Sequence, residues 1–159
     1  MKITSLIAQH LLDVHEGNNW TEVSLADVLK DTTLEEATTL TSASPNTIAS
    51  LLHHITYWNR AMVQRIAGNN VMIDEYNGFD LPELITEDDW LQLQVDNNLS
   101  SHELAVAILN FDNAKLEEPL VNGGSSAYKN MQGAVEHVHY HLGQMMILKK
   151  LVKAKREAE

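Results

Sequence analysis

The chain has 159 residues, of which 44% are hydrophobic, and a formal net charge of −11. This length predicts a single domain, residues 1–159, which is large enough to bury a hydrophobic core. The excess of 22 acidic over 11 basic residues argues against nucleic-acid binding, because a protein that binds phosphates needs a basic surface to displace their counterions. The absence of cysteine excludes disulfides, thiolate metal ligands and a cysteine nucleophile.

Neither a membrane-spanning protein nor a secreted protein is expected from the sequence. No apolar run approaches the roughly 20 residues that span a bilayer, and the N-terminal residues lack the apolar core and cleavage site of a signal peptide. We therefore expect a cytoplasmic protein without a membrane segment. Only 7 Gly and 3 Pro interrupt the chain, and its β-branched residues do not alternate, which favours an all-α fold.

The first predicted helix covers residues 2–15, where apolar residues recur at helical spacing. Gly17 then acts as a stop signal. A polar connector follows, and two short helices are expected within it, over residues 24–29 and 34–40.

The second long helix is predicted over residues 45–67. Ser44 is expected to be its N-cap and Pro45 its first helical residue. A long loop is expected over residues 71–89, and one or two extra helical turns over residues 90–95. These turns are predicted to be separate from the third long helix.

The third long helix is expected to begin at Ser100 or Ser101 and to end at Pro119. The fourth is predicted over residues 131–155, after a Gly-Ser loop. Each long helix carries an apolar stripe, and four such helices bury their stripes most simply as a four-helix bundle. The long connections on both sides of the second helix allow an order other than up-down-up-down.

Two histidines on the fourth predicted helix share one face. His137 and His141 are four residues apart and lie one turn above the other, whereas His139 points away from them and is expected to be solvated. Two imidazoles in this arrangement can bind one metal ion from a single helix, with bonds of about 2.0–2.1 Å.

A third ligand has to come from another helix, and the second long helix offers two candidates. His54 lies at the edge of the apolar stripe and can face the interior, whereas His53 lies almost opposite the centre of the stripe. A buried imidazole needs a partner, and a metal ion shared with His137 and His141 is one. The other histidines have no such arrangement and are expected to be ordinary: His10, His15 and His102.

Two familiar metal-binding patterns are absent from the sequence. The His-Glu-x-x-His motif of metalloproteases needs a glutamate after the first histidine, but Val138 follows His137. A di-iron bundle needs Glu-x-x-His on two helices, and only Glu136 and His139 have that spacing. The sequence therefore predicts a three-histidine site for one ion.

Residues 46–58, around His54, and residues 137–144 (His-Val-His-Tyr-His-Leu-Gly-Gln) resemble the DinB/YfiT-like superfamily. In that family a histidine of the second helix joins a His-x3-His of the last helix, and x-Gly-Gln commonly follows. His54, His137 and His141 occupy these positions, and the resemblance covers essentially the whole chain. One departure is Leu142, where members often carry arginine, which puts any anionic contact at that position in doubt.

The resemblance implies a bundle of DinB/YfiT type with long crossover connections, often a homodimer, and a nickel or zinc ion. Some relatives are thiol-dependent enzymes that transfer bacillithiol to electrophiles or isomerise substrates with mycothiol. Since this chain has no cysteine, such chemistry would need an external low-molecular-weight thiol.

Three imidazoles leave at least one coordination position open, and an open position is typical of catalytic metal sites. The leading hypothesis is a metal-dependent enzyme of the thiol-transferase or hydrolase type. Gln144 is a candidate for orienting a ligand or substrate, and a packing hydrogen bond between helices is its equally weighted alternative. Two other hypotheses are a metal-binding, stress-related dimeric bundle without catalysis and a bundle whose site stays empty in the cell.

Overall fold

The computed structural model describes residues 2–157, so Met1 and residues 158–159 of the predicted 1–159 domain lie outside the described residues. Within this range the chain is all-α, as predicted, and it forms no strand. None of the described helices is both long and apolar enough to cross a bilayer. The elements in chain order are α1 (Ile3–Glu16), α2 (Leu25–Leu29), α3 (Leu34–Thr38), α4 (Ile48–Ile66), α5 (Glu87–Asn110), the 3-10 helix η1 (Asn113–Lys115) and α6 (Ala127–Glu157).

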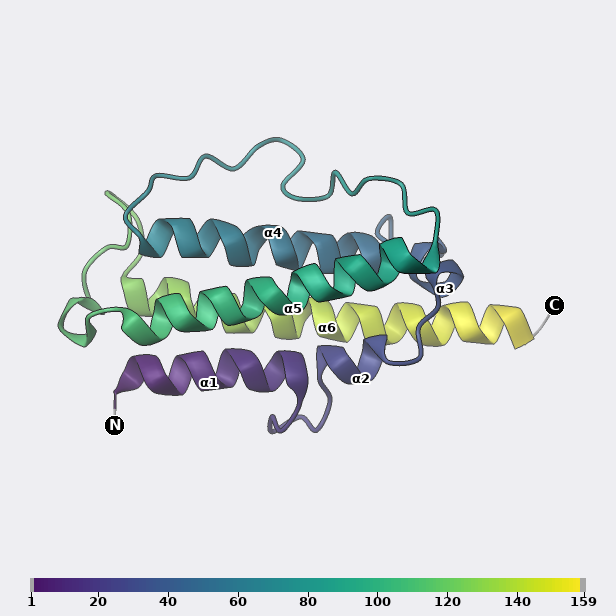
Figure 1. Cartoon of the computed structure of the whole chain (residues 1–159), viewed down its shortest axis with the longest axis horizontal. Helices are drawn as coiled ribbons and strands as arrows, with labels where there is room; N and C mark the ends of the chain where they lie inside the picture. Colours follow the sequence, from purple (N-terminus) through teal and green to yellow (C-terminus); the bar gives the residue numbers. More distant parts are fainter. Residues whose placement is uncertain (1, 158–159) are drawn as a thin grey trace.

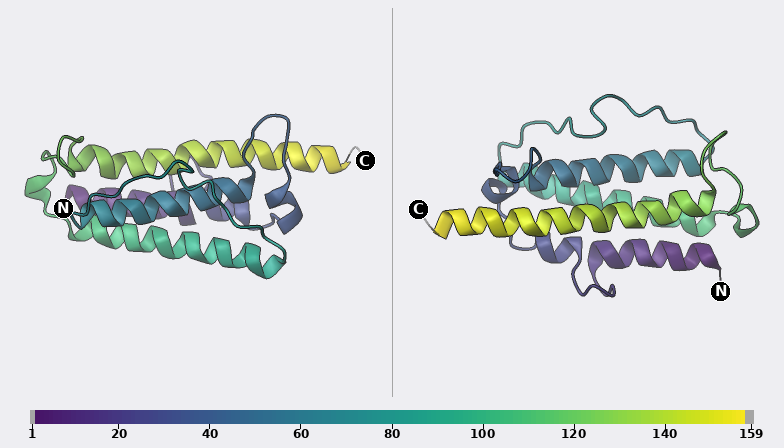
Figure 2. Two further views of the ribbon diagram at one scale, coloured as in Figure 1. Left: turned by 90° about the horizontal axis from the view of Figure 1, so that it is seen from above. Right: turned by 180° about the vertical axis from the view of Figure 1, so that it is seen from behind.

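The four long helices α1, α4, α5 and α6 pack side by side (Figure 1). The contacts join α1 to α5 and α6, and α4 to α5 and α6, so α1 and α4 lie on one diagonal. Helices α1 and α6 run in one direction while α4 and α5 run in the other (Figures 1 and 2). Because α4 and α5 are parallel, the chain needs a crossover, residues 67–86, that returns along the whole length of the bundle (Figure 2).

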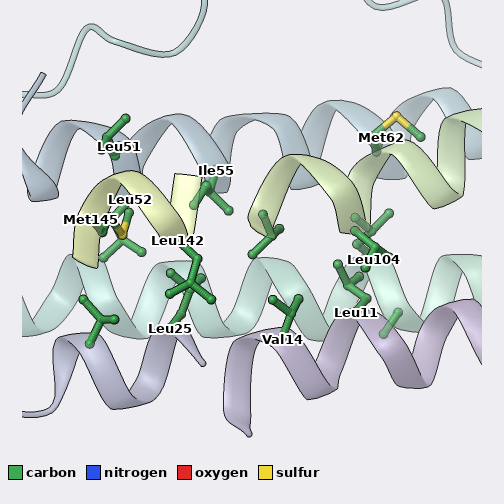
Figure 3. Packing of buried hydrophobic residues seen from close by; sticks show 14 of the residues in the cluster. Leu11, Val14, Leu25, Leu51, Leu52, Ile55, Met62, Leu104, Leu142 and Met145 are labelled. Atoms are coloured by element: carbon green, nitrogen blue, oxygen red, sulfur yellow. The ribbon is translucent and has the colours of Figure 1, made fainter. Parts of the chain in front are cut away.

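Buried aliphatic side chains from all four long helices fill the centre of the bundle (Figure 3). Leu11 of α1, Ile55 of α4, Leu104 of α5 and Leu142 of α6 belong to this core and are at most 3% exposed. Burial of such a side chain contributes about 1.5–3 kcal/mol. This core fixes the rotation of α4 and α6 about their axes, and so it decides which of their polar side chains face each other.

Helix α4 begins three residues later than predicted. The N-cap is Thr47, whose hydroxyl accepts a hydrogen bond from the backbone N–H of Ser50, while the Ser50 hydroxyl accepts from the backbone N–H of Thr47. Ser44 instead accepts a hydrogen bond from the N–H of Asn46 in a turn before the helix. The expected Ser44–Pro45 cap is therefore wrong, because this reciprocal pair satisfies the first turn better than a single hydroxyl does.

The predicted boundaries of the third long helix are also wrong at both ends. Helix α5 begins after Thr86, which forms a capping box with Asp89, and it runs without a break through the expected extra turns of residues 90–95. Three acidic residues in its first turn favour this start, since carboxylates stabilise a helix N-terminus. The helix ends at Asn110, because Phe111 is extended and the carboxylate of Asp112 caps η1.

Helix α6 begins at Ala127, four residues before the predicted start. The hydroxyl of Ser126 accepts a hydrogen bond from the backbone N–H of Lys129, which satisfies a donor of the first turn. The first predicted helix and the two short helices of the connector are confirmed with their ends shifted by at most two residues. The end of α6 lies two residues beyond the predicted one.

Candidate metal centre

The structure brings together the three histidines that the sequence selected. His54 lies in the middle of α4, and His137 and His141 lie one turn apart on α6, which packs against α4. The Nε2 atom of His137 is 3.0 Å from Nε2 of His54 and 3.0 Å from Nε2 of His141. One ligand atom from each of the three side chains lies within 4.8 Å of the others.

Two of these imidazoles have their Nδ1 atoms fixed by acceptors. Nδ1 of His54 is 2.6 Å from the backbone carbonyl oxygen of Asn77, and a carbonyl oxygen can only accept. Nδ1 of His141 is 2.7 Å from Oε1 of Gln144. A neutral imidazole carries one proton, so both rings hold it at Nδ1 and present a lone pair at Nε2.

The three Nε2 atoms therefore share too few protons to hydrogen-bond fully with one another. Even if His137 carries its proton on Nε2, that proton can form a good hydrogen bond with only one of its two neighbours. The Nε2 lone pair of the other neighbour then lies 3.0 Å from Nε2 of His137 without a proton directed at it. A cation at the centre of the cluster would satisfy all three lone pairs at once.

Two of the three separations between donor atoms suit a first-row divalent metal, and the third donor is within 4.8 Å. Bonds of about 2.0–2.1 Å separate two donor atoms by roughly 2.9 Å at right angles and roughly 3.4 Å at the tetrahedral angle. The two separations of 3.0 Å between Nε2 atoms fall within this range. The carbonyl and amide acceptors on Nδ1 of His54 and His141 are the outer partners that metal-binding histidines commonly have.

Burial keeps the cluster neutral near pH 7. Desolvation, together with the neighbouring His141 and His54, lowers the pKa of His137 to about 4. Desolvation also lowers the pKa of His54 and that of His141, although hydrogen bonds to Asn77 and Gln144 act in the opposite direction. Neutral imidazoles can donate lone pairs to a metal, whereas protonated ones cannot.

The crossover between α4 and α5 completes the site, and sequence reasoning missed it. Asn77 holds His54 through its backbone and also accepts a hydrogen bond from the indole N–H of Trp58 at 3.0 Å. The ring of Phe79 stacks on that of His54 with centroids 4.1 Å apart. The sequence predicted a loop over residues 71–89, which contains Asn77, Gly78 and Phe79, but nothing in it indicated which helix the loop would cover.

The remaining histidines lie outside the cluster. Nδ1 of His53 is 2.9 Å from the carbonyl oxygen of Gly78. His139 points away from the cluster as predicted, but it is half-buried and its ring lies 5.4 Å from that of His10, so its expected solvation is wrong. His15 was expected to be ordinary, yet it is only 4% exposed. Its Nδ1 lies 2.9 Å from the Leu11 carbonyl oxygen, and its Nε2 has no partner among the described residues.

A pocket of about 370 Å³ lies between α4 and α6 and opens onto two of the three histidines. His54 and His137 lie at one end of it, and Trp58 and Met62 form an apolar wall along α4. Gly133 contributes to the α6 side, where a Cβ atom would meet no other atom within 4 Å. A small molecule can therefore reach the histidine cluster along this groove.

Helical spacing and the two histidine motifs selected the same three residues, and the structure places those residues together. The three histidines could hold one metal ion. Hydrogen bonds to Asn77 and Gln144 fix the Nδ1 atoms of two of them, and a pocket opens onto the cluster. No protein-family model, curated protein or solved structure matches this chain significantly.

Proposed function

We propose that His54, His137 and His141 bind one divalent metal ion and that the chain is a metal-dependent enzyme acting on a small molecule. The proposal depends on one observation, the convergence of three Nε2 atoms that share at most one proton. A metal ion resolves this arrangement, and uncharged imidazoles select Zn²⁺, Ni²⁺ or a similar ion over Mg²⁺ and Ca²⁺.

The pocket favours catalysis over a purely structural role. Structural zinc sites are closed by four protein ligands, whereas catalytic sites have three and keep a position open. Here three histidines form the candidate set and a pocket reaches two of them. A divalent ion at such a position lowers the pKa of a water or thiol that joins it, and this provides a nucleophile near neutral pH.

The residues of the chain hold the site ready for that chemistry. Asn77 and Gln144 keep protons on Nδ1 of His54 and His141, so that both Nε2 atoms face the centre. Phe79 stacks on the ring of His54, and Trp58 lies edge-on to it. Since the chain has no cysteine, a sulfur nucleophile would come from an external low-molecular-weight thiol, and the reaction would be a thiol transfer. A hydrolase reaction would use water instead.

The motif resemblance supports a bundle of DinB/YfiT type, with nickel or zinc as the ion and a homodimer as the assembly. The parallel α4 and α5 with their long crossover agree with a bundle order other than up-down-up-down. Leu91, Val95 and Leu99 are exposed at four-residue intervals along α5 and could form a dimer contact. The molar mass of the chain in solution, measured by light scattering, tests the homodimer.

Metal analysis of tag-free protein tests the proposed site. We expect about one equivalent of zinc or nickel in the wild type and almost none in His54→Ala or His137→Ala. His139→Ala is the matched control, because His139 lies on the same helix but points away from the cluster, and it should keep the metal. Loss of metal from His139→Ala, or its retention in His137→Ala, would contradict the ligand assignment.

A screen for thiol conjugation and hydrolysis, run with metal and with chelator, then tests the enzyme proposal. We expect turnover of at least one electrophile or ester that depends on the metal and is lost in His54→Ala. If the wild type binds metal stoichiometrically and no thiol or substrate class reacts, the non-catalytic metal-binding alternative is correct.

A further inference from the structure

The end of the pocket farthest from the histidines is positively charged, although the protein as a whole is negatively charged. The chain has 22 acidic and 11 basic residues, yet the described pocket lining includes Arg65 and Lys129 and no carboxylate. Neither side chain has a carboxylate partner within ion-pair distance among residues 2–157. By contrast, Lys149, Lys153 and Arg156 of α6 pair with Asp31 or Glu36.

The two cations lie on opposite walls of the groove. Arg65 lies eleven residues after His54 on α4, and Lys129 lies eight residues before His137 on α6. Because the two helices are antiparallel, both cations are displaced toward the same end of the bundle. A rise of about 1.5 Å per residue places Lys129 roughly 12 Å along the helix from His137.

The side chain of Arg65 folds back toward the histidines. Its Cζ atom lies 5.2 Å from the centroid of the Trp58 ring, and the ring of His137 lies 6.0 Å from that of Trp58. Stacking on an indole leaves the guanidinium N–H groups free to donate at their edges. The apolar side chains of Trp58 and Met62 therefore lie between the candidate metal site and the guanidinium of Arg65, which has no carboxylate partner among the described residues.

We infer that the ligand of this pocket is an elongated small molecule with an apolar middle and a carboxylate or phosphate group that Arg65 and Lys129 bind. Its other end faces the metal, so this inference builds on the proposed function. The anionic group can belong to the substrate or to an external thiol, since both would occupy the same groove. The apolar middle packs on Trp58 and Met62.

The test uses cobalt-loaded full-length protein and two thiols of equal length, 6-mercaptohexanoate and 6-mercaptohexanamide. Absorption of the cobalt–thiolate pair reports binding at the metal. We expect the carboxylate to bind about tenfold or more tightly than the amide, because charge-assisted hydrogen bonds are roughly twice as strong as neutral ones. Arg65→Gln and Lys129→Gln should each reduce this preference for the carboxylate over the amide.

Lys150→Gln is the matched control, because Lys150 is an exposed lysine of α6 outside the pocket lining, and it should keep the full preference. Gly133→Leu should weaken both thiols by filling the groove, whereas Gly143→Leu, on an exposed part of the same helix, should not. Equal affinities of acid and amide in the wild type, or an unchanged preference in Arg65→Gln, would overturn the inference while the cobalt spectrum still supports the metal site.

A second arm needs no metal, so the two proposals can fail separately. Hexanoate, hexylphosphonate and hexanamide are titrated into chelator-treated protein, and the indole N–H signals are followed by NMR. We expect both anions to shift the signal of Trp58 and hexanamide to leave it in place. The anion that gives the stronger shift shows whether a carboxylate or a phosphate group is preferred. If neither anion shifts that signal in the wild-type protein, the proposed anion site is wrong, even if the protein binds metal normally.

Discussion

The backbone carbonyl of Asn77 accepts a hydrogen bond from Nδ1 of His54 over 2.6 Å, which ties the long crossover to the centre of the candidate site. Asn77 has a positive φ of 53° and Gly78 one of 75°. This pair of left-handed residues turns consecutive carbonyls toward α4, where His54 and His53 donate to them. The crossover that makes α4 and α5 parallel therefore also orients His54, a proposed metal ligand.

A substitution at Gly78 should weaken metal binding without removing a ligand. An alanine Cβ at this position would lie 2.6 Å from Cβ of Tyr57, and its positive φ disfavours any side chain. The turn has to move away from α4, and the carbonyl of Asn77 moves with it. We expect Gly78→Ala to lower the affinity for zinc about 10–100-fold, as loss of an outer partner commonly does, in a competition titration with a chromophoric chelator.

Gly68→Ala is the control for that experiment. Gly68 also has a positive φ, of 89°, but a Cβ there would meet no atom within 4 Å. The variant should lose about 1 kcal/mol of stability through backbone strain and keep wild-type affinity for zinc. Equal losses of affinity in both variants would show that strain alone, and not the position of Asn77, governs the metal site.

The hydrogen bond between His141 and Gln144 should strengthen the site from the opposite side. Gln144→Met removes the acceptor with little change in side-chain length, so Nδ1 of His141 loses its partner. We expect the affinity for zinc to fall about 10–100-fold. Gln144→Glu keeps an acceptor and should bind zinc at least as tightly as the wild type, because a carboxylate makes the imidazole more basic. If Gln144→Met bound zinc normally, Gln144 would serve helix packing alone.

The sequence predicted which three histidines converge but not their surroundings, and there is a physical reason for the difference. The i, i+4 spacing of His137 and His141 is fixed by the helix itself, and the burial of His54 follows from the apolar stripe of α4. The contact between Asn77 and His54 joins residues 23 apart through an irregular segment. The path of such a segment depends on tertiary packing, which single-sequence patterns do not contain.

The start of α5 illustrates a different kind of error. Ser100 and Ser101 resemble an N-cap, yet both are buried in the middle of the helix, and their hydroxyls donate to the carbonyls of Asn97 and Asn98. The hydroxyl of Ser100 also accepts from Asn59 of α4. A serine that satisfies its hydroxyl within a helix has the same sequence signal as one that caps a helix. The signal that marks the true start is the Thr86-x-x-Asp89 spacing of a capping box.

The Thr86 cap should therefore contribute measurably to stability. Its hydroxyl accepts a hydrogen bond from the backbone N–H of Asp89, and the Asp89 carboxylate accepts from the N–H groups of Thr86 and Ile85. We expect Thr86→Ala to lower the free energy of unfolding by about 1 kcal/mol, measured by urea denaturation. Thr86→Ser keeps the hydroxyl and should stay within a few tenths of a kcal/mol of the wild type. An equal loss in both variants would mean that the methyl group, and not the cap, is responsible.

Buried His15 should make the stability of the chain fall as the solution is acidified. Its pKa is lowered from the usual 6.5 to about 4, mainly by desolvation and also by His102 and His139, against the opposing effects of the hydrogen bond to Leu11 and the charge of Glu16. The unfolded chain therefore takes up a proton at a higher pH than the folded chain does. The stabilising contribution is complete above about pH 6.5 and is lost as the pH falls toward 4.

Urea denaturation of chelator-treated protein at pH 7.5 and pH 4.5 measures this contribution. The shift in pKa corresponds to a loss of about 2–3 kcal/mol between these two values. His15→Leu cannot take up a proton, so we expect its loss of stability on acidification to be smaller than that of the wild type by about this amount. His10→Leu is the control, because His10 is an exposed histidine of the same helix, and it should lose as much stability as the wild type. An equal acid-induced loss in the wild type and in His15→Leu would show that the groups of the histidine cluster, and not His15, control the response to pH.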